Sequence, residues 1–259
     1  MRHRSLAVFM FQFLVTSWCV QTAAGFEPGR VTVAPTTVEL GTFYGGAKVH
    51  VSGNTQAGSK VVVVVRGPST AEVFNNLGRV GPIWVNTGMV TISGVPSLLL
   101  IFSSEPIKAC LNSTAIDHYQ LDLESVRRHI QIEMKGPGRN GIADDFLAFK
   151  AQQGTYRISS GGVQMGVTAK EGVSYSLDFD MPKTAGLGKY EIDVLECSGG
   201  AVVNNADLDL AMEEVGFPAV IARMARERAP LYGAMSVIMA MVVGFGIDFV
   251  AARIFRRTV

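Results

Sequence analysis

An apolar stretch near the C-terminus, residues 231–252, constrains this chain more than any other feature of its sequence. It contains a single charged residue, Asp248, and is followed at once by Arg253. A helix of about 20 apolar residues crosses the hydrocarbon core of a bilayer, which is roughly 30 Å thick. The segment therefore predicts one transmembrane helix. The alternative is a C-terminal helix buried along its whole length in a soluble core.

A second apolar segment lies at the N-terminus. Arg2 and Arg4 precede an apolar run at residues 6–20, and small residues follow it, which is the layout of a secretory signal peptide. We predict a signal peptide over residues 1–25; an uncleaved N-terminal anchor is the alternative. Export of the N-terminal part followed by a stop-transfer span would leave the arginine-rich residues 253–259 in the cytoplasm. The expected location is the inner membrane, crossed once, with the main domain in the periplasm.

The region between these segments, residues 26–212, is predicted to form an exported β-rich domain. Up to residue 104 it consists of short alternating or β-branched runs, separated by turns rich in glycine and proline. The run Val61–Val65 is unbroken, which is typical of a strand covered on both faces. Short strands separated by such turns favour an antiparallel sandwich.

Residues 106–153 interrupt the strand pattern and predict an inserted pair of helices. The first is expected within residues 111–135, where apolar residues recur three and four apart and so share one helical face. These residues are Leu123, Val126, Ile130 and Met134. The second helix is expected at residues 142–153.

Strand patterns return after residue 155, with a hairpin expected from residues 173–179 and 188–196 and an edge strand at 201–210. The simplest assembly is mainly β: one immunoglobulin-like antiparallel sandwich with the helical pair inserted, plus one C-terminal transmembrane helix. Two small β domains are the alternative. Residues 213–230 are predicted to form a juxtamembrane helix.

Two cysteines remain after removal of the predicted signal peptide, Cys110 and Cys197. In an oxidising compartment such a pair often forms a disulfide, which would here close a long loop. The alternative is that both are small buried hydrophobic residues. The residue pattern leaves both interpretations open.

The predicted span carries a stripe of small residues. Gly233, Ala240 and Gly244 recur at helical spacing, and small residues of this kind let a second helix approach closely. Asp248 adds a carboxylate that could contact another helix, or could simply lie near the interface beside the arginines. We predict a helix-packing face formed by these four residues.

The sequence offers little for catalysis, cofactors or nucleic acid. A net charge of +1 argues against a nucleic-acid-binding protein, which typically carries a basic stripe or domain. The chain has no nucleophile elbow, H-E-x-x-H or C-x-x-C motif. Residues 136–141 match the spacing of a dinucleotide-binding loop, but we expect a helix rather than a strand before them, so they are interpreted as a helix-breaking loop. We therefore predict no catalytic residue, no metal and no cofactor.

These features together resemble the Alph_Pro_TM family of predicted transmembrane proteins of alphaproteobacteria. The C-terminal part of the chain carries most of the resemblance, in Gly154-Thr155-Tyr156-Arg157, Gly188-Lys189-Tyr190-Glu191-Ile192, Gly216-Phe217, Ala229-Pro230-Leu231-Tyr232-Gly233 and Ile254-Phe255-Arg256. None of these motifs is catalytic, so the resemblance implies no active-site residues. It does imply an association with sulfite-exporter-type permeases.

The first functional hypothesis is a non-enzymatic, membrane-anchored periplasmic protein that accompanies a polytopic membrane protein through its span. The second is an anchored enzyme or a protein that binds a small molecule or metal. Its site would lie at the junction of sandwich and helices, near His118, Asp122 and His129. A passive structural domain of the envelope is the third.

Overall fold

The computed structural model describes residues 31–136, 140–169 and 172–255. The predicted signal peptide and the last residues of the predicted tail, 256–259, lie outside them.

A four-stranded sheet has the order β1-β3-β11-β10, a six-stranded sheet β2-β13-β12-β4-β7-β9, and a three-stranded sheet β5-β6-β8. The four-stranded sheet comprises β1 (Val31–Ala34), β3 (Ala47–Thr55), β11 (Gly172–Met181) and β10 (Gln164–Ala169). The six-stranded sheet comprises β2 (Thr37–Leu40), β13 (Ala201–Glu214), β12 (Gly188–Ser198), β4 (Lys60–Arg66), β7 (Leu99–Ser103) and β9 (Tyr156–Ser160). The three-stranded sheet comprises β5 (Glu72–Val80), β6 (Ile83–Ser93) and β8 (Gln131–Lys135).

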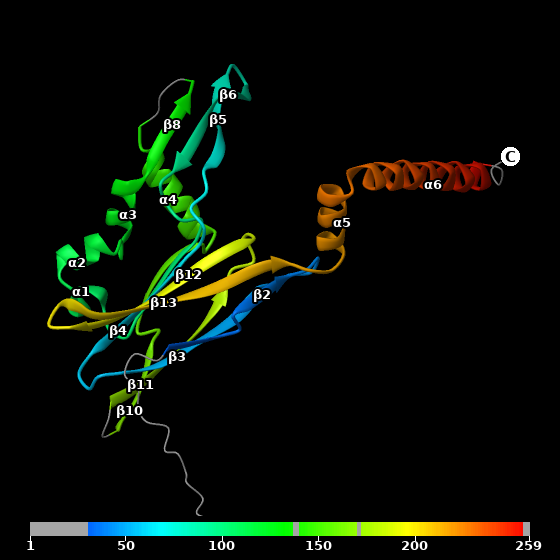
Figure 1. The fold of residues 1–259 in the computed structure, drawn as a ribbon. Coiled ribbons are helices and arrows are strands. Elements are labelled where there is room, and N and C mark those ends of the chain that lie inside the picture. The colour runs from blue at the N-terminus through cyan, green and yellow to red at the C-terminus, as the bar shows by residue number, and fades with distance from the viewer. Residues whose placement is uncertain (1–30, 137–139, 170–171, 256–259) are drawn as a thin grey trace, which may run out of the picture.

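The four-stranded sheet packs against one face of the six-stranded sheet and forms the predicted sandwich (Figure 1). Alternating residues of β11, namely Tyr175, Leu177 and Phe179, point into the shared core together with Tyr190 and Ile192 of β12. Neighbouring strands are mostly antiparallel, while the outer pairs β2–β13 and β7–β9 are parallel. The structure thus confirms a mainly β fold built on an antiparallel sandwich.

The other face of the six-stranded sheet carries a second core. Val62 and Val64 of β4 lie in it, whereas Val61, Val63 and Val65 lie in the first core, and none of the five is exposed. The prediction of a strand covered on both faces is confirmed. Four short helices complete this second layer: α1 (Ile107–Cys110), α2 (Ser113–His118), α3 (Leu123–His129) and α4 (Ile142–Gln152). The three-stranded sheet projects beyond them, on the side away from the four-stranded sheet (Figure 1).

The first predicted helix of the insertion is wrong in its extent. The segment 111–135 contains three whole elements, α2, α3 and β8, because Asp122 and Ser125 form a capping box that starts a new helix and α3 ends at His129. Ile130 and Met134 therefore do not share a helical face with Val126. Met134 instead pairs with Val90 in the three-stranded sheet.

The strand β8 also changes the context of residues 136–141, because a strand precedes them where a helix was expected. This strand pairs antiparallel with β6, so it does not belong to the parallel strand–helix–strand unit that binds dinucleotides. Residues 137–139 of this loop lie outside the described part of the chain.

One expectation about the later strands is also wrong. Strands β11 and β12 do not form a hairpin, because the connection between them crosses from one sheet to the other. Their apolar residues thus face each other across the core instead of lying side by side. The edge strand expected at residues 201–210 is confirmed over that range, where β13 pairs with β12 alone; β2 pairs with β13 only at residues 211–214.

Two helices follow the β domain. Helix α5 (Gly216–Glu227) begins just after β13, so the first residues of the predicted juxtamembrane helix belong to the strand. Helix α6 (Ala229–Phe255) contains the whole predicted span. Pro230 lies in its first turn, where the missing backbone N–H costs no hydrogen bond, and Arg228 separates the two helices.

Candidate functional site

Helix α6 stands apart from the β domain. Within the described residues it is the one helix long and apolar enough to cross a membrane, over Ala229–Arg253, and none of its most apolar stretch is buried. Large side chains such as Ile238 and Phe245 are exposed along its length. A water-exposed helix of this composition would be strongly unfavourable, so lipid or another membrane helix must surround it.

The four predicted packing residues lie on one side of α6. With about 100° of rotation per residue, Gly233, Ala240, Gly244 and Asp248 fall within an arc of about 80°. A Cβ placed on Gly233 or Gly244 would meet nothing within 4 Å. Asp248 makes no hydrogen bond or ion pair within residues 31–136, 140–169 and 172–255. The face thus carries a strip of small residues that ends in a carboxylate.

The two cysteines lie in the same core cluster and are free thiols in this structure. Cys110 ends α1, and the residues just after it are held to the end of β12 by a hydrogen bond from the Asn112 amide to the Gly200 carbonyl (2.8 Å). Cys197 is on β12 and is fully buried. The fold therefore brings the two cysteines into one region, and the disulfide stays a prediction.

Burial should make both thiols unreactive in the folded protein. Desolvation raises the pKa of Cys197 to about 12 and also raises the pKa of Cys110, so both thiols stay protonated at neutral pH. In a Cys19→Ser background, we expect almost no maleimide labelling of the folded chain at pH 7 and labelling of both Cys110 and Cys197 in urea. The readout is intact-protein mass without reductant. Rapid labelling without urea would contradict the burial, and absence of labelling in urea would reveal the disulfide.

The residues predicted to flank a ligand at the sandwich–helix junction are not gathered at one cavity. Asp122 caps α3 by accepting a hydrogen bond from the Ser125 amide (2.7 Å). The Nδ1 atom of His129 lies 2.8 Å from the Ser125 carbonyl oxygen, and His118 packs edge-on against Tyr119. Within the described residues no three His, Cys, Asp or Glu side chains lie close enough to hold a metal ion.

A cavity of about 190 Å³ lies elsewhere, between α4 and the three-stranded sheet. Its walls include the rings of Phe74, Phe146 and Phe149; the Phe74 ring contacts the other two edge to face, with centroid distances of 6.0 Å to Phe146 and 5.8 Å to Phe149. Beside it, Lys150 is 4% exposed and forms an ion pair with Glu72. Sequence reasoning missed this cavity because its rings come from segments about 70 residues apart, which only the folded chain brings together.

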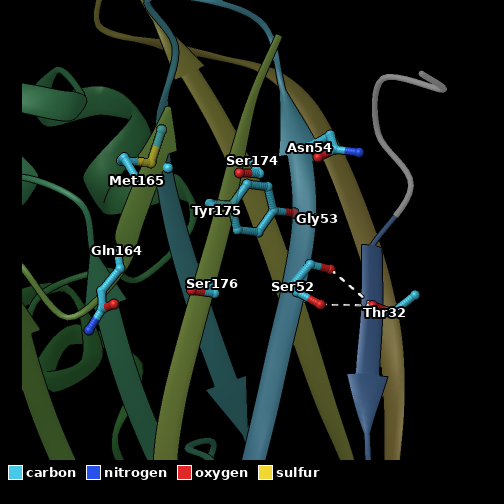
Figure 2. A pocket seen from close by; sticks show the side chains of 10 residues that line it. Thr32, Ser52, Gly53, Asn54, Gln164, Met165, Ser174, Tyr175 and Ser176 are labelled. Carbon is cyan, nitrogen blue, oxygen red and sulfur yellow. Dashed lines mark hydrogen bonds between the residues drawn. The ribbon is translucent and has the colours of Figure 1, made fainter. Parts of the chain in front are cut away.

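A second cavity, about 480 Å³, lies on the four-stranded sheet. The register aligns Thr32, Ser52, Ser176 and Gln164 in one row across all four strands, as Figure 2 shows. The Thr32 hydroxyl lies 3.0 Å from the Ser52 hydroxyl. These side chains alternate with core residues along their strands, so the period-two pattern could have revealed this uncharged polar surface.

Comparison with known proteins agrees with the architecture. A family model described as "Putative transmembrane protein (Alph_Pro_TM)" matches residues 30–257. No curated protein and no solved structure matches the chain. The match extends from the start of the first sheet to the end of α6 and so includes both the β domain and the apolar helix. The chain belongs to this family of transmembrane proteins and is anchored in a membrane by α6.

Proposed function

We propose that this protein is a non-enzymatic accessory subunit of a polytopic membrane protein, and that it docks through α6. The β domain would lie in the periplasm, with α6 in the inner membrane and the tail in the cytoplasm. A sulfite-exporter-type permease is the proposed partner, as the family resemblance implies. The observation that carries the proposal is the face of Gly233, Ala240, Gly244 and Asp248, which no part of the described β domain covers.

The energetics favour a partner on this face over lipid. A carboxylate costs up to about 2.5–3.5 kcal/mol at the centre of a span and less toward the interface. Asp248 lies in the C-terminal half of α6, so this cost is partial, and a hydrogen-bond donor on a neighbouring helix would reduce it further. The small residues next to Asp248 allow the close approach that such a hydrogen bond needs.

The test compares two glycines of α6 on different sides. Gly244→Leu should displace the partner, because the larger side chain would prevent the close approach of a second helix at this face. Gly246→Leu is the matched control, since Gly246 lies on the opposite side of the helix and a Cβ there also meets no atom within 4 Å. The measurement is the amount of permease that co-purifies from membranes in mild detergent, quantified by mass spectrometry.

We expect loss of the permease with Gly244→Leu and retention with Gly246→Leu. Asp248→Asn should retain part of the complex, because the amide keeps an acceptor oxygen and loses the charge. Equal recovery of permease with both glycine variants would refute docking through this face. Absence of the permease from the unaltered protein would refute the proposed partner.

A further inference from the structure

Helix α5 is amphipathic, but its apolar side faces away from the core of the β domain instead of toward it. Its apolar residues Phe217, Val220, Ile221 and Met224 recur three and four apart and so share one side. None of its residues is buried, and the Phe217 and Val220 side chains are 74% and 56% exposed. The apolar side of α5 is therefore not covered by the described part of the chain.

The polar side of α5 faces the β domain. Arg223 and Arg226, together with Ala219, line one wall of a 550 Å³ groove, and Glu213 and Glu214 at the end of β13 line another. A helix that served the protein core would point its apolar residues toward the sheet and its arginines outward. In α5 the orientation is reversed: the arginines face the β domain and the apolar residues face away from it. The surroundings on the side away from the β domain must therefore be apolar.

The position of α5 identifies that medium. A single residue, Arg228, joins α5 to the membrane helix, and backbone hydrogen bonds run through the joint, from Arg228 N to the Met224 carbonyl (2.9 Å) and from Tyr232 N to the Arg228 carbonyl (3.0 Å). Figure 1 shows α5 running across the axis of α6. When α6 crosses a bilayer, α5 consequently lies along the bilayer surface.

We propose that α5 is an interfacial helix that lies in the boundary between headgroups and acyl chains, in the leaflet on the β-domain side. Phe217, Val220 and Met224 enter the acyl region, to the depth of about 5–10 Å that is typical of such helices. Arg228, at the joint, lies at headgroup level, where its charge can contact phosphate groups. The occupant of this face is thus the lipid of the membrane that α6 crosses, independently of any partner of α6.

The turn before α5 fits this placement. Gly216, the first residue of α5, has a φ of +75°, a conformation that suits glycine, and only Val215 separates it from the end of β13. The chain can therefore leave the sheet and turn sharply into α5. The β domain then rests above the surface helix, with the groove of Glu213, Glu214, Arg223 and Arg226 on its water-facing side.

Tryptophan fluorescence of the full-length chain in lipid vesicles tests the proposal. In a background of Trp18→Phe and Trp84→Phe, Phe217→Trp places an indole on the apolar side and Ala222→Trp places one on the far side of the same helix. Purified chains are reconstituted into phosphatidylcholine vesicles, with or without bromine on the acyl chains near the headgroups. No partner protein is present.

We expect Phe217→Trp to give blue-shifted emission that loses most of its intensity in brominated vesicles. Ala222→Trp should emit at longer wavelength and keep most of its intensity. Equal quenching of the two variants, or stronger quenching of Ala222→Trp, would overturn the proposal. Unquenched, red-shifted emission from Phe217→Trp would also overturn the proposal, because it would show that this face does not contact lipid and is available to a protein partner. Circular dichroism checks that both variants keep the secondary structure of the parent chain.

Discussion

Replacement of Lys150 by methionine should lower the free energy of unfolding of the β domain by about 3 kcal/mol. The Lys150 ammonium forms an ion pair with Glu72, donates a hydrogen bond to the Ser97 carbonyl (3.0 Å) and lies 5.5 Å from the centre of the Phe146 ring. Methionine keeps the volume of the side chain but leaves the Glu72 carboxylate without its cation. Removal of one partner of a buried pair costs about 3–5 kcal/mol. Because the Glu72 side chain is 27% exposed, we expect the lower end of that range.

Two control variants separate this effect from a general loss of charge. Glu72→Met combined with Lys150→Met should recover most of the lost stability, because a well-packed apolar pair often replaces a buried ion pair at little cost. Lys189→Met removes one partner of the exposed pair Lys189–Asp209 (3.0 Å) and should change stability by less than about 1 kcal/mol. The measurement is urea unfolding of the full chain in detergent, followed by near-ultraviolet circular dichroism. A double variant no more stable than Lys150→Met would contradict the explanation.

The second prediction with a large expected effect concerns the six-stranded sheet, which contributes side chains to both hydrophobic cores. Leu100 and Ile101 are neighbours on β7, both fully buried, and they point into the first and second core respectively. Leu100→Ala and Ile101→Ala should each lower the free energy of unfolding by about 2–5 kcal/mol through lost burial and a residual cavity. Because β7 belongs to both cores, each variant should shift one common unfolding transition.

The same urea titration gives the readout, with a fluorescence probe at Trp84 of the three-stranded sheet in addition to near-ultraviolet circular dichroism. Ile158→Ala on the adjacent strand β9 is the control, because Ile158 pairs with Ile101 across the sheet and is 39% exposed; its effect should be clearly smaller. If Ile101→Ala shifted the transition seen at Trp84 and left the other probe unchanged, the two layers would unfold independently. That outcome would favour the alternative of two small β domains.

The elements predicted correctly are those whose own residues determine their structure. The unbroken valine run of β4 requires apolar surroundings on both faces, and the length of the apolar stretch in α6 requires a membrane. Strand β8 could not be predicted in the same way. Ile130 and Met134 fit a helical period, yet Ile130, Ile132 and Met134 also alternate as in a strand. Pairing of β8 with β6, some 40 residues earlier in the chain, decides between the two.

The candidate sites also differ in whether the sequence alone can reveal them. The face of α6 can be derived from sequence because helical rotation alone brings Gly233 and Asp248 to one side. The apolar side of α5 is visible in the sequence too. Which way this side faces relative to the β domain depends on the path of the chain from β13 into α5. The cavity of Phe74 and Phe146 requires the tertiary fold. The alternation of polar residues along each strand of the four-stranded sheet is visible in the sequence, but their alignment in one row requires the strand register. Local periodicity cannot report on strands that become neighbours only when the chain folds.

The route of the chain from β13 into the membrane also has a mechanical consequence. Strand β13 pairs with β12 along residues 201–212 and with β2 at residues 211–214, directly before the corner at Gly216. The ladder hydrogen bonds run perpendicular to the strands in the antiparallel β12–β13 pair and at a slant in the parallel β2–β13 pair. A force on α6 that acts along β13 is therefore shared by many of these ladder hydrogen bonds at once, in shear, and does not break them one after another. Displacement of the membrane helix would move the six-stranded sheet as a rigid body, with Gly216 as the compliant joint.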